Sequence, residues 1–519
     1  MENMRNIFVL IALVSGFFMA ILDSNIVNIA LPGMAKTFHT SIDAISWIAN
    51  GYNVAFVTCL LMAARLADQF GRKKLYLIGL LGFSISSFMC GVASSFQMLV
   101  IFRVLQGISA AIIVPVAMPL GLELVPKEKQ GMIGGVMGAF GGLAAAIGPS
   151  LGGVLIDKLS WNWVFFINVP VGIFSLIFIF LFIKESYDHT ASSKIDWAGM
   201  VTSSCALFLL VYALIQVNKA TLSPLSISLL FVISIISFML FIYIEKKSKN
   251  PMLPLYLFSY DKFSLSNLAL FFVGMGLMNF LFIFAFYLVQ VEGMSELKSG
   301  MIISTLAIVS IIITAIMTPI AAKRGSSVIS SVGVIAFIVV SYLFGHMESS
   351  FSAWDYIWRL VIVGFGAGCT LAPLTTTAVL SVPIEKSGIA SSISNISRTL
   401  GSIVGVAVLV VLLNQQLLNE KEKVNQQAIT MIQKSNQTNL EKKQILQAIQ
   451  SVDKQERVIV ESKEGNELYE QMRWKYKHAV IRSFNQTFLI GAFIFLLALI
   501  CNVVEIYMNR KRGSGAKTI

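Results

Sequence analysis

Residues 7–31 have the sequence IFVLIALVSGFFMAILDSNIVNIAL, a long apolar run with one acid, Asp23, in its interior. A helix that crosses a bilayer needs about 20 mainly apolar residues, so this run predicts a membrane-spanning helix. It is too long, and too polar from Asp23 to Asn28, for the apolar core of a cleaved signal peptide. We therefore predict a retained first span that carries a carboxylate inside the membrane.

The rest of the chain repeats this pattern. Of its 519 residues, 56% are hydrophobic and 13% are charged, whereas an ordinary soluble domain has about 25% charged residues. This composition excludes a single-anchor enzyme, a nucleic-acid-binding domain and a disordered chain. It predicts an all-α integral membrane protein with fourteen spans. The predicted spans are 7–31, 45–64, 75–94, 98–120, 131–156, 163–183, 197–217, 225–244, 263–290, 300–322, 327–345, 354–380, 388–414 and 484–508.

The basic residues predict the orientation, because cytoplasmic loops carry the excess of Lys and Arg. With the N-terminus inside, the tails and inner loops hold twenty of the 39 basic residues, and the short outer loops hold four: Lys36, Lys158, Lys219 and Lys298. Both termini are therefore expected in the cytoplasm, and the formal net charge of +12 reflects this topology rather than an anionic or nucleic-acid partner.

A long segment, about 415–483, would then be extracellular. It has no proline and one glycine, Gly465, and apolar residues recur along it at helical spacing. This pattern predicts two amphipathic helices with a break before or at Gly465, which together form an outer helical hairpin. The hairpin is a candidate docking surface for a protein partner.

Cysteine and histidine give no sign of a metal, redox or imidazole site. All five cysteines fall in apolar runs, and none of the four histidines lies in a predicted span. We find no nucleophile–base set, phosphate-binding loop or metal-ligand spacing, so we expect neither an enzyme nor a cofactor.

Charged residues inside spans are costly and mark function by default. A proton or a cationic substrate could neutralise Asp23; the alternative is a permanent ion pair or a polar cluster held by neighbouring asparagines. Arg103, in the sequence Arg103-Val104-Leu105-Gln106-Gly107, could bias that carboxylate or could bond backbone carbonyls of a neighbouring helix. For Arg359 and Arg398 the second role, in packing, is favoured. Which acid each arginine contacts stays open.

Two further segments stand out. The predicted fifth span is rich in glycine and contains Gly148-Pro149-Ser150-Leu151-Gly152-Gly153, so a partner helix can approach closely and the helix can bend. Either tight packing or a sliding seam between two conformations would use these glycines. Between the second and third spans, Asp68-Gln69-Phe70-Gly71-Arg72-Lys73-Lys74 predicts a tight, basic cytoplasmic turn.

Together these segments resemble the signature motifs of the major facilitator superfamily in order and spacing. The matching residues are Asp68, Gly71, Arg72 and Lys73, then Arg103 with Gln106 and Gly107, then Gly148 to Gly153. Leu22-Asp23 with Asn28-Ile29-Ala30-Leu31-Pro32, Ser160-Trp161-Asn162-Trp163 and Ile167-Asn168-Val169-Pro170-Val171-Gly172 resemble the fourteen-span drug:proton antiporters of the QacA/EmrB type. The resemblance covers the first 172 residues by motif and the rest by layout.

The resemblance implies a major facilitator fold with a six-helix bundle at 1–185, an inserted helix pair at 186–255 and a second bundle at 256–519. It implies a proton-coupling or substrate site at Asp23, Arg103, Asn25 and Gln106, a conformational latch at Asp68, Gly71 and Arg72, and an antiporter motif at Gly148, Pro149, Gly152 and Gly153. Glu123, Arg359 and Arg398 are secondary candidates. Ala64, Gln69 and Ala144 depart mildly from the family motifs. The tenth span has no acid, so selectivity for dications is not expected.

The first hypothesis is therefore proton-driven export of lipophilic, cationic or neutral compounds by a monomer in the cytoplasmic membrane, with the proton gradient as energy source and no cofactor. The second is a dedicated exporter of an endogenous metabolite or lipid. The third is a transporter-like membrane receptor or assembly partner that uses the outer hairpin.

Overall fold

The computed structural model describes residues 2–40, 42–126, 130–187, 196–217, 222–248, 251–347, 352–434 and 463–515, and within these ranges the chain is helical without strands. The first half contains α1 (Glu2–Thr37), α2 (Ile42–Ile45), α3 (Trp47–Phe70), α4 (Arg72–Gly91), α5 (Phe96–Glu123), α6 (Gln130–Lys158), α7 (Trp163–Phe166) and α8 (Asn168–Phe182). There follow α9 (Trp197–Val217), α10 (Pro224–Lys247), η2 (Leu255–Ser259), α11 (Asp261–Gln290), α12 (Glu296–Arg324), α13 (Ser326–Phe344), α14 (Ala353–Leu380), η3 (Ile384–Lys386), α15 (Ser387–Lys434) and α17 (Lys463–Gly515).

Thirteen helical stretches within the described residues are long and apolar enough to cross a membrane. The remaining predicted span, 131–156, falls in the 29-residue helix α6, which includes the shorter apolar stretch Met132–Ala144. The prediction of an all-α membrane fold is confirmed, whereas the count of fourteen spans stays a prediction.

Serine side chains fix where several helices begin. The hydroxyls of Ser95, Ser223 and Ser295 accept hydrogen bonds from backbone N–H groups in the first turns of α5, α10 and α12. Ser352 and Asp355 form a reciprocal capping box at the start of α14. These caps satisfy backbone donors that the helices themselves leave free.

Buried apolar residues form two large clusters. One draws mainly on α1, α3, α4, α5, α6 and α8, and the other on α11 to α15 and α17. We call α1–α8 the N-terminal bundle and α11–α17 the C-terminal bundle. Helix α15 contributes to both clusters, with Ile389 and Ile393 in the first and Leu409 and Leu413 in the second. The predicted boundaries at residues 185 and 255 stay predictions.

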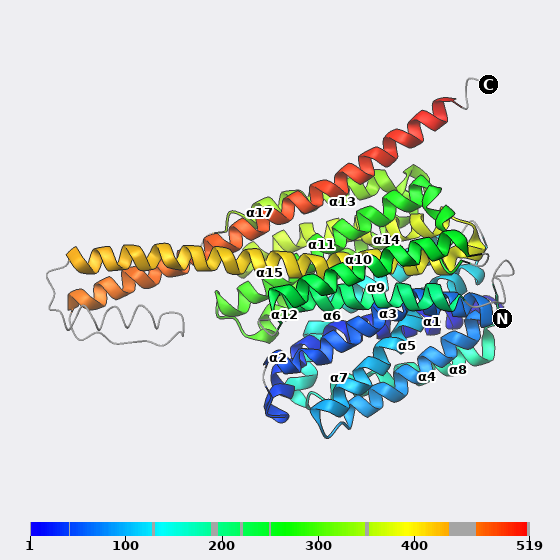
Figure 1. Cartoon of the computed structure of the whole chain (residues 1–519), viewed down its shortest axis with the longest axis horizontal. Helices are drawn as coiled ribbons and strands as arrows, with labels where there is room; N and C mark the ends of the chain where they lie inside the picture. The colour runs from blue at the N-terminus through cyan, green and yellow to red at the C-terminus, as the bar shows by residue number, and fades with distance from the viewer. Residues whose placement is uncertain are drawn as a thin grey trace.

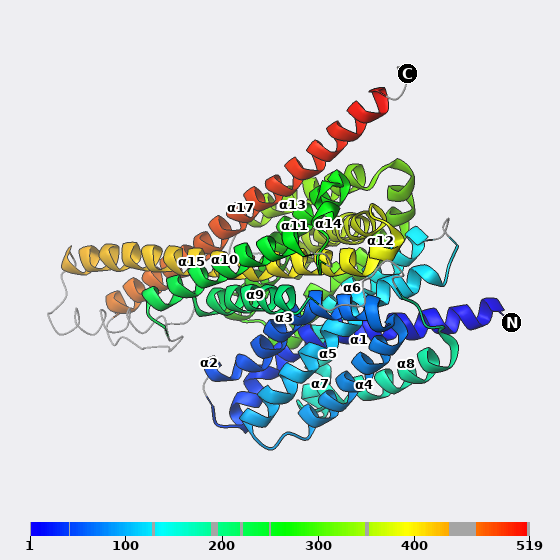
Figure 2. The ribbon, with the colours of Figure 1, turned by 45° about the vertical axis from the view of Figure 1, so that its right-hand side comes forward.

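Helices α9 and α10 pack against each other, and α9 also contacts α3 and α15 (Figure 2). Helix α10 is otherwise open to its surroundings, with large apolar side chains such as Leu225 and Met239 exposed by 71% and 66%. In a membrane protein such a surface faces lipid. The pair therefore lies along the outside of the two bundles.

Helices α15 and α17 extend well beyond the other helices, at the end of the molecule opposite both termini (Figure 1). In these extensions Lys475 Nζ lies 3.4 Å from Gln427 Oε1, and an Arg482–Glu420 ion pair spans 3.5 Å. These contacts join the two extensions, and each extension is continuous with a spanning helix, because α15 runs unbroken to Lys434 and α17 from Lys463. Gly465 lies inside α17, so the predicted break at Gly465 is wrong, because α17 already begins at Lys463; a break before it would fall at 435–462, outside the described residues.

Candidate functional site

Asp23 and Arg103 form an ion pair in the interior of the N-terminal bundle. Asp23 comes from α1 and Arg103 from α5, and both side chains have an exposed fraction of 0%. Charges so far from water persist only when paired and hydrogen-bonded. The sequence predicted both residues for this site, and the structure brings them together.

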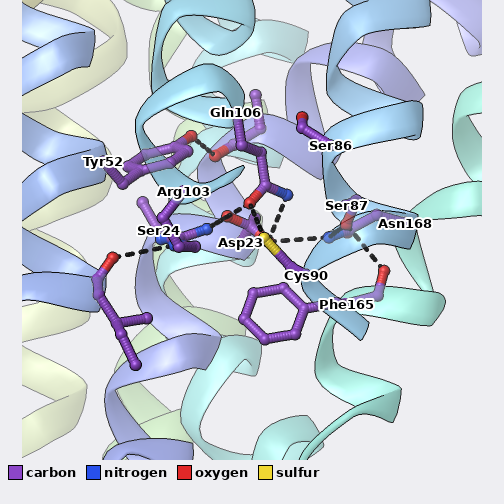
Figure 3. Close-up of polar contacts among 12 residues, drawn as sticks. Asp23, Ser24, Tyr52, Ser86, Ser87, Cys90, Arg103, Gln106, Phe165 and Asn168 are labelled. Atoms are coloured by element: carbon purple, nitrogen blue, oxygen red, sulfur yellow. Dashed lines mark hydrogen bonds and ion pairs between the residues drawn. The ribbon is translucent and has the colours of Figure 1, made fainter. Parts of the chain in front are cut away.

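Two amides complete the bonding of the carboxylate (Figure 3). Asn168 Nδ2 and Gln106 Nε2 donate to Asp23 Oδ1 at 2.8 and 3.1 Å, while Arg103 Nη1 donates to Asp23 Oδ2. Gln106 lies one turn after Arg103 on α5, and its Oε1 accepts a hydrogen bond of 2.6 Å from Arg103 Nη1. Asn168, at the start of α8, also donates to Ser87 Oγ at 3.0 Å. Three helices, α1, α5 and α8, therefore meet at one carboxylate, and Asn168 links it to a fourth, α4.

Arg103 is held on its other sides by a carbonyl and by aromatic rings. Its Nε donates to the Ile48 carbonyl at 3.0 Å, and its Cζ lies 4.3 Å from the Tyr52 ring centroid and 5.7 Å from that of Phe165. Cation–π contacts of this kind gain strength where water is absent. Arg103 Nη2 has no hydrogen-bond partner within the described part of the chain.

Asn25, also predicted for this site, lies elsewhere. Its Nδ2 donates to the Ile21 carbonyl at 2.7 Å on its own helix, and its Cβ is 3.0 Å from where a Cβ on Gly148 of α6 would stand. Sequence reasoning missed Asn168 and Tyr52 as members of the site. Asn168 offered a signal, since it is a polar residue within an apolar run; Tyr52 offered none.

The predicted latch residues meet at the junction of α3 and α4. Arg72 Nε lies 2.8 Å from Asp68 Oδ1, and Arg72 Nη1 lies 2.7 Å from Glu123 Oε1 on α5. Arg72 Nη2 donates to the Glu385 carbonyl at 3.0 Å, just before α15. A single guanidinium thus joins three segments, including one that leads into the C-terminal bundle. Gly71 has φ of 113°, a conformation that side chains disfavour.

Two neighbours tighten this junction. A Cβ on Gly388, at the start of α15, would lie 2.9 Å from Asp68 Oδ1, so α15 and the Asp68 carboxylate are in close contact. Glu185 accepts hydrogen bonds from the backbone N–H groups of Lys73 and Lys74 at 2.8 and 3.1 Å. A carboxylate there offsets the positive end of the α4 dipole.

Helix α6 contacts α1 of its own bundle and α12 and α14 of the C-terminal bundle, and its glycines allow these contacts to be close. A Cβ on Gly134 or Gly138 would overlap Thr376 or Ala372 of α14, at 1.8 and 2.1 Å. On the side toward α1, a Cβ on Gly152 would lie 2.9 Å from Ile26. The glycines therefore permit close approach on two sides. Pro149 and Gly153 of the predicted motif lie on the same helix.

The other two membrane arginines are in the C-terminal bundle. Arg359 Nη1 donates to the Asp355 carbonyl of its own helix at 2.7 Å, and its Cζ lies 4.3 Å from the Trp358 ring. It lies in the second turn of α14. Arg398 lies in the middle of the apolar part of α15 and is half-buried. Neither lies in the Asp23 cluster.

No group of three or more His, Cys, Asp or Glu side chains that could hold a metal ion is present among the described residues. The Asp23 carboxylate is a group that can accept a proton. A proton added to it would cancel one charge of the buried pair and leave Arg103 without this counter-ion.

Comparison with known proteins identifies the family. A model described as Major Facilitator Superfamily matches residues 13–406. Multidrug resistance protein 3 of Bacillus subtilis is 32% identical over 405 residues, which cover 77% of this chain and 78% of that protein. The tetracenomycin C resistance and export protein of Streptomyces glaucescens is 30% identical over 404 residues, 78% of this chain and 75% of that protein.

Among solved structures, the human organic anion transporter MFSD10 superposes with a TM-score of 0.59 over 94% of this chain and 99% of that chain, at 14% identity. At this identity the likeness shows the fold alone. Together with the sealed Asp23 cluster, the resistance-protein relatives agree with the motif resemblance to drug:proton antiporters. The chain therefore belongs to the major facilitator superfamily, and it is a multi-pass membrane transporter rather than an enzyme.

Proposed function

We propose that the protein is a proton-coupled antiporter that exports lipophilic, cationic or neutral compounds across the cytoplasmic membrane by alternating access. The main support for this proposal is the buried Asp23–Arg103 ion pair with its two amide donors. Such a site can exchange a proton only when the bundle opens, and that requirement ties proton movement to transport. The printed names of its relatives, which are resistance and export proteins, support the direction of transport.

The latch supports the alternating-access part of the proposal. Arg72 pairs with Asp68 and Glu123 inside the N-terminal bundle and also donates to the Glu385 carbonyl just before α15, so the contact with Glu385 must break for the two bundles to separate at that end. We expect both termini in the cytoplasm, which makes this end the inner one and the conformation one that is closed to the cytoplasm. The glycines of α6 provide the surface on which α12 and α14 move against the N-terminal bundle.

A transport assay tests the function. Protein in proteoliposomes with an imposed pH gradient should move ethidium, a fluorescent lipophilic cation, only while the gradient lasts, and ethidium added to purified protein should release protons. Asp23→Asn should abolish both signals. Asp157→Asn, at an exposed acid near the end of α6, is the matched control and should retain both. Full gradient-driven transport by Asp23→Asn would refute the assignment of Asp23.

The same proposal places the extensions of α15 and α17 outside the cell, where they form either a gate or a docking surface for a protein partner. Glu420, Arg482, Gln427 and Lys475 join the two helices there. Deleting about residues 418–480 and joining the ends with a short linker separates these roles from transport. Normal export by purified, reconstituted deletion protein would exclude the gate.

A further inference from the structure

Arg398 lies deep in the membrane part of α15. It is about three helical turns, or roughly 16 Å, from the start of α15 at Ser387, which is about half of a hydrocarbon core of ~30 Å. A Cβ built on Gly274 of α11 would lie only 2.3 Å from the Arg398 carbonyl oxygen. The backbones of α15 and α11 are therefore in direct contact at this point. The base of the side chain is therefore fixed between two helices.

The guanidinium of Arg398 has no counter-ion among the described residues. Over the part of the chain that the structure describes, it makes no hydrogen bond, ion pair or ring contact. Arg72 and Arg103, by contrast, are buried and each pair with an acid. An arginine keeps its charge at any accessible pH. A full positive charge is thus held inside the membrane region without compensation, which is costly unless an anion joins it.

Arg398 lies in a part of α15 that other helices enclose. Every residue of α15 from Ser387 to Asn395 is buried, partial exposure begins at Ile396 and includes Arg398, and the first exposed residue is Val408, at 41%. Helix α15 is surrounded by α3, α5 and α9 as well as α11, α14 and α17. A lipid-facing helix such as α10 instead has large side chains exposed by half or more, such as Leu229 at 51%.

Polar and apolar groups adjoin the charge. Ser391, Asn395 and Ser402 lie on the same face of α15 as Arg398 by helical spacing. Ser402 Oγ donates to the Arg398 and Gly274 carbonyls at 2.9 and 3.3 Å. To the sides, Ile396 and Leu400 pack toward the N-terminal bundle, and Phe272 and Met275 of α11 pack toward the C-terminal bundle. The surroundings combine one cation with apolar surface.

We propose that Arg398 binds the carboxylate of lipophilic organic acids, which adds this substrate class to the cationic or neutral cargo above. The proposal rests on the proposed export function. The planar guanidinium matches a carboxylate through two parallel N–H···O bonds, and the apolar side chains on either side accommodate the hydrocarbon body of the ligand. The ligand anion then supplies the counter-charge that the described part of the protein lacks.

A matched pair of fluorescent probes tests this site. Binding of 4-(1-pyrenyl)butyrate and of its carboxamide is measured at pH 7 in proteoliposomes without any gradient, with protein-free liposomes subtracted. The two probes share one apolar body and differ in charge. Wild-type protein should prefer the carboxylate by about tenfold or more, as expected for a charge-assisted hydrogen-bonded pair.

Three variants locate the preference. Arg398→Gln should reduce the carboxylate-to-amide ratio to about one without changing amide binding, and that unchanged binding shows that the variant folds. Arg398→Lys should keep a reduced preference, because lysine retains the charge but not the planar fork. Arg359→Gln, outside the proposed site, should behave like wild type. Equal binding of the two probes by wild type, or an unchanged ratio in Arg398→Gln, overturns the proposal.

The gradient-free assay also separates this inference from the proposed function. Carboxylate preference that depends on Arg398, without any gradient-driven transport of pyrenylbutyrate or ethidium, would uphold the site and refute proton-coupled export. Gradient-driven ethidium transport without carboxylate preference would do the reverse.

Discussion

The two bundles treat a membrane-buried arginine in opposite ways. In the N-terminal bundle, Arg103 is sealed at 0% exposure against Asp23. In the C-terminal bundle, Arg398 is partly exposed and has no partner among the described residues. The turn between α3 and α4 and the turn between α12 and α13 also differ in whether they carry an arginine. Gly71 and Gly325, with φ of 113° and 94°, begin corresponding turns, but Arg72 follows the first and Ser326 the second.

This difference teaches that the same side chain serves two purposes according to its surroundings. A paired, sealed arginine fixes the charge state of an acid and resists change until the bundle opens. An unpaired, accessible arginine is available to a ligand. On this view the N-terminal bundle carries the proton-coupling and latch residues, and the C-terminal bundle contributes a recognition residue.

The largest effect should come from breaking the sealed pair. Arg103→Gln leaves Asp23 buried without its counter-ion and should lower the free energy of unfolding by about 3–5 kcal/mol, the range found when one partner of a buried pair is removed. Thermal unfolding in detergent, followed with a dye that reacts with newly exposed thiols such as the buried Cys90, measures it.

The double variant Asp23→Asn/Arg103→Gln and Arg398→Gln serve as the comparison. The double variant removes both charges, so it should regain most of the stability while transport stays absent. Arg398→Gln removes a charge that has no partner and should not destabilise the protein. If Arg398→Gln were as destabilising as Arg103→Gln, the contrast between the two bundles would be lost.

The next effect concerns the latch. Arg72→Gln removes contacts to Asp68, Glu123 and the Glu385 carbonyl, so the closed conformation should lose about 2–3 kcal/mol and gradient-driven ethidium transport should fall at least tenfold. Arg72→Lys should restore little, because one ammonium group cannot reproduce the three separate contacts.

Arg324→Gln is the control for the latch, since Arg324 ends α12 at the corresponding turn of the C-terminal bundle. It should transport at close to the wild-type rate. An equal loss in both variants would mean that the two turns act alike.

The sequence predicted site residues best where a charged residue lies within or next to an apolar run. Asp23, Arg103 and the Asp68–Arg72 turn could be predicted because charges in or beside spans are rare and costly. The Arg72 contact with the Glu385 carbonyl could not, since it joins residues 313 positions apart through a backbone atom. Sequence also cannot reveal that Arg398 lacks a partner, because that depends on where every other side chain points.

The extensions of α15 and α17 show the same limit. The fall in apolar content near residue 414 predicted the end of a span, but α15 continues to Lys434 because helix formation does not stop where hydropathy does. The amphipathic pattern correctly predicted helix as far as Lys434, and Val424, one of its apolar positions, is buried with 4% exposure. Hydropathy and helicity are therefore separate signals, and Gly465 shows in addition that a single glycine does not by itself end a helix.

A smaller effect tests how much the amides matter to the sealed site. Asn168→Ala removes the 2.8 Å hydrogen bond to Asp23 and the 3.0 Å hydrogen bond to Ser87. The free energy of unfolding should therefore fall by about 1–3 kcal/mol. Asn25→Ala removes bonds within its own helix and should cost less. The same thermal unfolding assay ranks the two, and a larger loss for Asn25→Ala would remove Asn168 from the site.

The smallest effect should come from an ion pair of the same chemistry in the extensions of α15 and α17. Glu420 pairs with Lys423 and Arg482 at 2.7 and 3.5 Å, but the two basic side chains are 66% and 62% exposed. Exposed pairs are worth about 0–1 kcal/mol because water and salt screen them, so Glu420→Ala should lower the unfolding midpoint only slightly. Raising the salt concentration should shrink that difference further, whereas the effect of Arg103→Gln should persist. Glu420→Ala could instead lower the unfolding midpoint as much as Arg103→Gln, with no effect of salt. Burial would then not determine how much these ion pairs stabilise the protein, and the contrast between the sealed N-terminal site and the rest of the molecule would need another cause.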